Sequence, residues 1–144
     1  MEFFIIQTIK RIKGLSSRKH KELRTACDET TRAIEEKKRV LKSKLAVDIN
    51  ADKYFLPFQL ACKTNNAKMI SAALDCMQKL IAYGYLLGEA IVTNESTGET
   101  RKLIDVVVET ICSCNGHTDE NVQLQVIKAL LTAVSCNHCD ASQA

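Results

Sequence analysis

The stretch AKMISAALDCMQKLIAY, residues 67–83, decides the fold class of this 144-residue chain. Its apolar residues recur at i, i+1, i+4, i+5 and i+8, which is the spacing of a wide apolar face on an amphipathic α-helix. This face consists of Met69, Ile70, Ala73, Leu74, Met77, Leu80 and Ile81. Gly84 follows and can take the left-handed conformation that ends a helix. The pattern therefore predicts a helix over residues 67–83.

Towards the N-terminus the pattern predicts three further helices. Phe4 or Ile5, followed by Ile9 and Ile12, marks one side of a short first helix. A long, densely charged helix is expected from about residue 18 to about residue 46, with an apolar stripe of Leu23, Cys27, Thr30, Ile34, Leu41 and Leu45. A short helix is expected to begin near residue 55 or 56, since Pro57 is tolerated only near a helix start, and to end near residue 63. Asp52 is predicted to cap it.

Towards the C-terminus the pattern predicts a loop and two helices. Residues 86–100 contain Gly88, Asn94, Ser96 and Gly98 and predict a polar loop. The next helix, residues 101–113, is expected to face inward with Leu103, Ile104, Val107, Val108, Ile111 and Cys112. A capping signature at Thr118 precedes the last helix. Its expected inward face is Val126, Ile127, Leu130, Leu131 and Val134.

The last four predicted helices match in pairs at a shift of 50 residues. The matched positions are Leu56 and Val106, Phe58 and Val108, Ala61 and Ile111, Cys62 and Cys112, Leu74 and Leu124, Met77 and Ile127, Leu80 and Leu130, and Ile81 and Leu131. Such helix pairs bury their apolar faces by stacking. The sequence therefore predicts an all-α, armadillo- or HEAT-like helical solenoid of about six helices. Residues 1–50 form its basic helical cap, and residues 51–85 and 101–136 form helix-pair repeats.

Composition excludes several classes of protein. Hydrophobic residues make up 46% and charged residues 26%, with a single proline, which excludes collagen-like, proline-rich and mostly disordered chains. No apolar run approaches the roughly 20 residues of a membrane span. Seven cysteines, an odd number, without a recognisable signal peptide predict free thiols in a reducing, cytosolic compartment.

Charge is distributed unevenly along the chain. Residues 1–50 contain 13 lysines and arginines against seven acidic residues, a net charge of +6, whereas residues 51–144 carry −3. The basic helix could therefore bind nucleic acid or an anionic membrane, which is the alternative function. Interspersed acidic residues and the lack of interleaved aromatics favour a solvated charged face instead.

No residue pattern predicts catalysis, a cofactor or a metal. The Cys112-x-Cys114 pair, His117 and the Cys136-x-x-Cys139 pair with His138 resemble a zinc set, but C-x-C is a poor finger spacing. Core and tail thiols are the favoured interpretation. No histidine has a recognisable partner that could activate a cysteine. Neither G-x-x-x-x-G-K nor G-x-G-x-x-G occurs.

Aromatic residues beside lysines are the candidate partner-binding residues. Lys53, Tyr54 and Phe55 stand at the entry to the first repeat, and Lys79 and Tyr83 lie near the end of the following helix. Exposed aromatics suit protein interfaces. For each ring, the alternative is burial in the adjacent core.

Several stretches resemble one family closely. They are residues 51–62 (ADKYFLPFQLAC), 74–84 (LDCMQKLIAYG), 102–105 (KLID), 109–114 (ETICSC) and 122–134 (VQLQVIKALLTAV). They resemble the amino-terminal dimerisation and cyclophilin-binding domain of the large Arf guanine nucleotide exchange factors of the brefeldin A-inhibited group. The resemblance covers about residues 18–138.

The resemblance implies a fold and a regulatory role. It implies an armadillo-like solenoid that is not itself an enzyme, because the exchange domain of the family is a separate downstream domain. Implied partners are an Arf-like small GTPase, a second copy or the downstream helical domain of the exchange factor, and cyclophilin, with no nucleic acid. The implied location is cytoplasmic, peripheral at trans-Golgi network and endosome membranes, in vesicle trafficking.

The resemblance also implies that residues 1–144 are part of a longer regulatory domain. The family continues with more helices, so we expect a fragment, a short isoform or an incomplete gene product. On this expectation the last repeat exposes an apolar face that further helices normally cover.

Overall fold

The chain folds into paired α-helices, as the sequence predicts. The computed structural model describes residues 2–41 and 51–135. The α-helices among these residues are α1 (Glu2–Leu15), α2 (Lys21–Leu41), α3 (Leu56–Cys62), α4 (Ala67–Ala82), α5 (Leu103–Ser113) and α6 (Glu120–Ser135). A 3-10 turn, η1 (Asp52–Tyr54), precedes α3, and two short strands, β1 (Ile91–Thr93) and β2 (Thr100–Lys102), precede α5. The all-α, solenoid-like class is confirmed.

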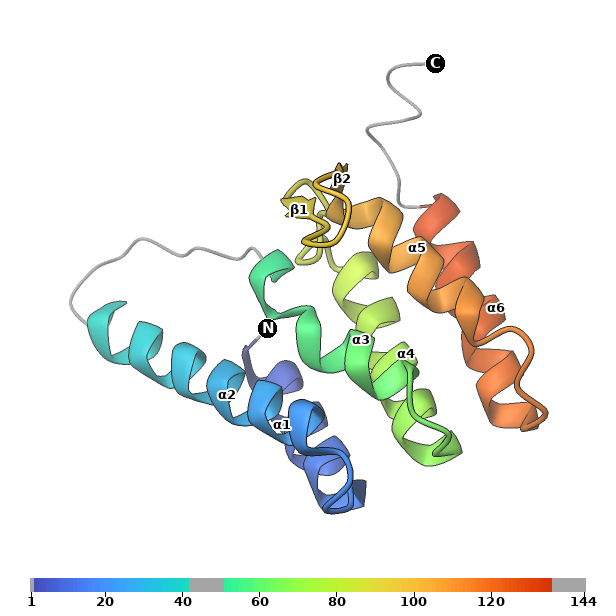
Figure 1. Cartoon of the computed structure of the whole chain (residues 1–144), viewed down its shortest axis with the longest axis horizontal. Coiled ribbons are helices and arrows are strands. Elements are labelled where there is room, and N and C mark those ends of the chain that lie inside the picture. The colour runs from blue at the N-terminus through green and yellow to red at the C-terminus, as the bar shows by residue number, and fades with distance from the viewer. Residues whose placement is uncertain (1, 42–50, 136–144) are drawn as a thin grey trace.

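The helices stack in two layers (Figure 1). The helices α2, α3 and α5 form one layer, and α1, α4 and α6 lie behind them in the other. Each helix of the first layer packs on its chain neighbour in the second, as α1 with α2, α3 with α4, and α5 with α6. The helix α4 lies between α1 and α6, so its two flanks are both covered.

The helix α4 begins and ends where its sequence predicts. The Asn66 side chain accepts a hydrogen bond from the backbone N–H of Met69 at 3.1 Å, which satisfies one of the free donors of the first turn. Gly84 follows with a φ of +77°, a conformation that suits glycine. All seven residues of the predicted apolar face are buried.

Two other predicted helices differ from the structure at their ends. The helix α2 runs over Lys21–Leu41 instead of residues 18–46, and the rest of that range lies outside the described residues. Leu23, Cys27, Thr30 and Ile34 are buried as predicted. The helix α6 is capped by Asp119 and not by Thr118, because Asp119 Oδ1 accepts the N–H groups of Asn121 and Val122.

Residues 91–102 form a β-hairpin where the sequence predicts a polar loop. The strands β1 and β2 pair antiparallel, with Ile91 opposite Lys102 and Thr93 opposite Thr100. Gly98, at a φ of +75°, lies in the connection. The hairpin was missed because its strands have three residues each and almost all their side chains are exposed, so they lack an alternating apolar pattern.

The side chain of Asp52 binds the backbone just before the hairpin, although Asp52 lies 35 residues earlier in the sequence. Its Oδ1 accepts the N–H groups of Leu87 and Gly88, both at 2.9 Å, and its Oδ2 accepts that of Ala90 at 3.1 Å. Asp52 therefore does not cap α3 as predicted, and it joins the η1 segment to the chain beyond α4. Gly88 is required here, because a Cβ atom on it would lie 2.4 Å from Ile104 Cβ.

Replacing Asp52 should destabilise the fold strongly. The substitution Asp52→Ala leaves three backbone donors without their charged acceptor, and we expect a loss of about 3 kcal/mol in the free energy of unfolding. The measurement is urea denaturation followed by helical circular dichroism. Glu95→Ala, at an exposed position of the hairpin connection, is the control and should change stability by no more than about 0.5 kcal/mol. Equal effects of the two substitutions would contradict the role given to Asp52.

Candidate interaction surfaces

The five predicted partner-binding residues separate into core and surface. Tyr54 and Phe55 are each only 3% exposed and belong to the core, so the buried alternative holds for both rings. Lys53 is exposed, and its Nζ lies 5.6 Å from the centroid of the Tyr54 ring. Lys79 is half-buried, and Tyr83 is 61% exposed.

Tyr83 belongs to a row of aromatic rings that we call the aromatic surface, formed by Phe3, Phe4, Tyr83 and Tyr85. The Tyr83 ring is stacked on that of Phe4, with 6.3 Å between centroids, and also lies 6.3 Å from that of Tyr85. Phe3 meets Phe4 edge to face. The row thus combines the first turn of α1 with the end of α4, and sequence analysis missed the contribution of α1.

The aromatic surface and the Lys53 segment are neighbours. The backbone N–H of Ala51 donates to the carbonyl oxygen of Tyr85 at 2.7 Å, which places the entry to η1 beside the end of the aromatic row. Lys79, one turn before Tyr83, pairs with Asp75 at 3.0 Å. The hydrogen bond with Asp75 raises the pKa of Lys79, so the side chain is a cation at neutral pH.

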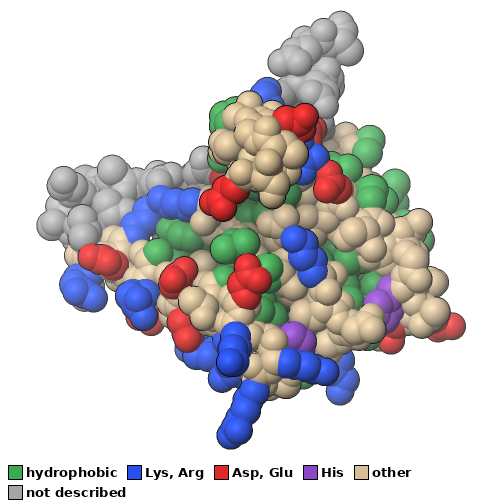
Figure 2. All heavy atoms as spheres, viewed as in Figure 1, with side chains coloured by type: hydrophobic (Ala, Val, Ile, Leu, Met, Phe, Trp, Pro, Cys, Tyr) green, Lys and Arg blue, Asp and Glu red, His purple; other side chains and the backbone are tan. Residues whose placement is uncertain are grey.

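A second surface lies on α6. Leu124, Ile127, Leu131 and Val134 are between 54% and 79% exposed, and we call them the α6 apolar face. Their spacing of three, four and three residues places them on one stripe of the helix. Figure 2 shows hydrophobic side chains reaching the surface along the right-hand edge, where Figure 1 places α6.

The predicted inward face of α6 is therefore wrong in part. The buried residues of α6 are Val122, Val126, Ala129 and Ala133. Two polar contacts join α6 to α4. Gln78 donates a hydrogen bond to Thr132 at 3.1 Å, and the Lys128 ammonium lies 3.9 Å from the Asp75 carboxylate. Periodicity located the apolar residues but could not tell which side of the helix has a neighbour.

The shift of 50 residues explains why the α6 apolar face is uncovered. Leu74, Met77 and Ile81 of α4 match Leu124, Ile127 and Leu131 of α6, and the three α4 residues are buried. Among the described elements α4 has major packing partners on both flanks, whereas those of α6 are α4 and α5. The α6 apolar face thus has the chemistry of a helix-packing surface, and no helix among the described residues covers it.

The basic helices do not form a uniformly positive surface. Over α2, Figure 2 shows cationic and anionic side chains intermixed. A hollow of about 350 Å³ between α1 and α2 is lined by Lys10, Lys13 and Arg32 together with Asp28 and Glu35. Lys13 also forms an ion pair with Asp28. This mixture of signs disfavours phosphate binding, because a phosphate backbone attracts cations and repels carboxylates.

The cysteines of the C-x-C pair lie differently from the prediction. Cys112 is exposed and Cys114 is buried, so Cys114 takes the inward position that the repeat assigned to Cys112. Within residues 2–41 and 51–135, no three histidine, cysteine or acidic side chains gather as a metal site would require. Cys136, His138 and Cys139 lie outside the described residues.

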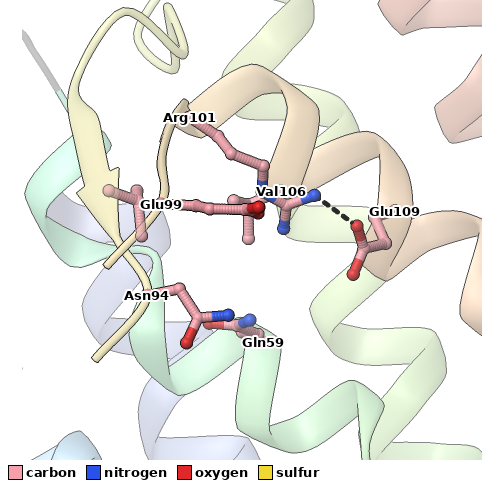
Figure 3. A pocket seen from close by; sticks show the side chains of 7 residues that line it. Gln59, Asn94, Glu99, Arg101, Val106 and Glu109 are labelled. Atoms are coloured by element: carbon pink, nitrogen blue, oxygen red, sulfur yellow. Dashed lines mark hydrogen bonds and ion pairs between the residues drawn. The ribbon is translucent and has the colours of Figure 1, made fainter. Parts of the chain in front are cut away.

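A hollow of about 360 Å³ lies between the hairpin, α3 and α5 (Figure 3). Figure 3 shows the amide groups of Asn94 and Gln59 pointing toward one another across it, and the Arg101 guanidinium paired with Glu109. The hydrogen bond from Arg101 lowers the pKa of the Glu109 carboxyl. Glu109 is therefore a carboxylate at neutral pH and is unsuited to act as a general acid.

No helix among the described residues is long and apolar enough to cross a bilayer.

The chain matches one family over almost its whole length. Residues 3–142 match the model of the Mon2/Sec7/BIG1-like dimerisation and cyclophilin-binding domain. Brefeldin A-inhibited guanine nucleotide-exchange protein 1 of Rattus norvegicus is 56% identical over 94 residues, 64% of this chain and 5% of that protein. Exchange protein 3 of Arabidopsis thaliana is 37% identical over 144 residues, 88% of this chain and 8% of that protein.

A fungal relative extends the same pattern. The ADP-ribosylation factor guanine nucleotide-exchange factor sec71 of Schizosaccharomyces pombe is 31% identical over 137 residues, 93% of this chain and 7% of that protein. This chain therefore spans less than a tenth of the length of each of these relatives.

The division of the aromatic residues into core and surface predicts losses of stability that differ in size. Phe55→Ala should lower the free energy of unfolding by about 3–5 kcal/mol, because it leaves a cavity in the core. Tyr83→Ala should cost no more than about 1 kcal/mol, because it removes only exposed ring contacts. Urea denaturation of both variants is the measurement, and a larger loss for Tyr83→Ala than for Phe55→Ala would contradict the assignment.

Proposed function

Because the chain belongs to the Mon2/Sec7/BIG1-like dimerisation and cyclophilin-binding domain family, we propose that it is a non-catalytic interaction module of an Arf guanine nucleotide exchange factor. The match is to a domain named for dimerisation and cyclophilin binding, which supports a regulatory role. The relatives are named as guanine nucleotide-exchange proteins, and this chain aligns with only a small part of each. The nucleotide-exchange activity therefore belongs, on this proposal, to other parts of such proteins.

The α6 apolar face is the observation that carries the proposal. Its four large side chains are spaced like the a and d positions of a heptad, the pattern by which one helix packs along another. Fully burying one such side chain is worth about 1.5–3 kcal/mol, and because these four are already partly buried each would contribute a part of that. Eight of them, four from each of two copies, would act against the loss of freedom on association, about 4–15 kcal/mol. We propose that a second copy of the chain covers this face.

We propose a symmetric pairing of α6 with α6 rather than head-to-tail stacking. The exposed residues beside the α6 apolar face include the uncharged Gln123 and Ser135 together with Glu120 and Lys128, and Lys128 lies 3.9 Å from Asp75 of its own chain. Head-to-tail stacking would instead place the face against α1, whose exposed residues include Phe3 and Phe4 as well as Gln7, Lys10 and Arg11. An isologous contact closes as a dimer, whereas a heterologous one can propagate.

The aromatic surface is the proposed contact for an Arf-like small GTPase. It presents Phe4 and Tyr83 to solvent, with the cation Lys79 one turn away and the Lys53 segment beside Tyr85. Aromatic rings with nearby cations are typical of protein interfaces. Tyr54 and Phe55 contribute by fixing the backbone that carries Lys53, since both rings are buried.

Recruitment by such a GTPase would define the place of action. We propose that the chain is a cytoplasmic protein held at the periphery of trans-Golgi network and endosome membranes, where it takes part in vesicle trafficking. Docking on the downstream helical domain of the exchange factor and binding of cyclophilin are further proposed contacts, supported by the family description alone.

Charges introduced into the α6 apolar face should abolish self-association. Ile127→Glu combined with Leu131→Glu places two carboxylates opposite their symmetry mates, and we expect dimer affinity to fall by about tenfold or more. The measurement is sedimentation equilibrium over a range of protein concentrations. Leu56→Glu is the matched control, because Leu56 is also a half-exposed leucine but lies on α3. Equal association of all three proteins, or a wild-type chain that is monomeric throughout, would contradict the proposed contact.

Changes at the aromatic surface should weaken GTPase binding. Lys79→Glu with Tyr83→Ala removes a cation and an exposed ring, and we expect affinity for a GTP-loaded Arf-like GTPase to fall by about tenfold or more. The measurement is a calorimetric titration with the GTPase loaded with GTP analogue or GDP. Lys68→Glu is the control, since Lys68 is an exposed cation in the first turn of the same helix. Unchanged affinity would make the placement wrong, and no binding by the folded wild type would exclude GTPase recruitment.

A further inference from the structure

Two cysteines from different helix pairs meet inside the solenoid. Cys62 is the last residue of α3, and Cys114 directly follows α5. The Cys114 thiol donates a hydrogen bond to the backbone carbonyl oxygen of Cys62, with the Sγ atom 3.8 Å from that oxygen. Both residues are buried, although they are 52 positions apart in sequence.

A hollow gives small molecules a path to the two thiols. Its volume is about 410 Å³, and its lining includes both cysteines, Thr64, Ser113 and His117. It lies between the turn that follows α3 and the turn that follows α5, at one end of the stacked helix pairs. The thiols are thus covered by protein but adjoin a space large enough for a reagent of a few atoms.

We propose that Cys62 and Cys114 form a two-cysteine oxidation site, at which a hydroperoxide such as hydrogen peroxide generates an intrachain disulfide bond. The site rests on the 3.8 Å approach of Cys114 Sγ to the backbone of Cys62 and on the hollow that both residues line. It is independent of the dimerisation and GTPase contacts proposed above. Its effect would be to join the end of α3 covalently to the end of α5, so that the two helix pairs could no longer shift past one another.

The electrostatics of the pair distinguish it from the other buried cysteines. The hydrogen bond with Cys62 lowers the pKa of the Cys114 thiol below its ordinary value, which favours its thiolate form. The same hydrogen bond and burial raise the pKa of Cys62, which stays protonated. Burial raises the pKa of Cys27 and of Cys76 to about 11. Because thiolates and not thiols react with peroxides, Cys114 is the expected point of attack.

The reaction balances in two steps. The Cys114 thiolate attacks one oxygen of hydrogen peroxide, the O–O bond breaks, and Cys114 sulfenic acid and hydroxide form. The Cys62 sulfur then attacks the sulfenic sulfur, the S–O bond breaks, and the S–S bond forms. The hydroxyl group leaves as water with the Cys62 proton. Overall, two thiols are oxidised, one peroxide is reduced, and two molecules of water are produced once the hydroxide takes up the proton that Cys114 released.

The test maps the oxidised bonds in the full chain. Reduced protein is treated with an equimolar amount of hydrogen peroxide, remaining thiols are blocked, and a digest made without reductant is analysed by mass spectrometry. The expected result is one dominant linked pair, the Cys62 peptide with the Cys114 peptide, lighter by two hydrogen atoms than the reduced pair. Linkage of Cys114 to Cys112, linkage between chains, or free thiols at both positions after full consumption of peroxide would overturn the proposal.

Variants provide the matched controls. Cys62→Ser should leave Cys114 at the sulfenic stage, which a dimedone probe traps, and Cys114→Ser should abolish peroxide consumption at this site. Cys27→Ser and Cys76→Ser, which remove buried cysteines elsewhere in the chain, should leave the Cys62–Cys114 linkage unchanged. The linked wild type should also unfold at a higher temperature than its reduced form. Loss of the linkage in Cys27→Ser or Cys76→Ser folded as wild type would contradict a two-cysteine site.

Discussion

The packing of α4 between α1 and α6 holds the described part of this chain together. A helix with an apolar face as wide as that of α4 cannot be satisfied by one neighbour, and the chain supplies α1 on one flank, α6 on the other and α3 in the adjoining layer. The same requirement for neighbours on both flanks applies to α6. The helix α6 repeats the apolar positions of α4 but packs mainly on α4 and α5, so Leu124, Ile127 and Leu131 remain exposed where Leu74, Met77 and Ile81 are buried. The proposed interaction surface is thus a consequence of the stacking rule that builds the fold.

Local patterns in the sequence were sufficient to predict the helices. Spacing of three and four residues and the position of Pro57 depend on residues that are close together in the chain, so they can be evaluated without the fold. The similarity between residues 51–85 and 101–136 also follows from sequence, and it leads to the all-α solenoid class.

Features that depend on distant parts of the chain could not be predicted. Asp52 looked like a helix cap, yet its partners are the N–H groups of residues 87, 88 and 90. Tyr54 and Tyr83 each stand near a lysine in the sequence, but only the structure separates the buried ring from the exposed one. Likewise, sequence analysis placed Cys112 inward, whereas Cys114 is the buried cysteine of the pair. In each case the deciding contact comes from another helix or loop, about which periodicity carries no information.

We propose that the α6 apolar face is a surface by which the chain binds a second copy of itself. Hydrogen–deuterium exchange measured at low and high protein concentration tests this contact, because association protects the backbone amides there. We expect exchange to slow with concentration in residues 120–135 and to stay constant in α2. Concentration-independent exchange in α6, or protection that appears in α2 instead, would contradict it.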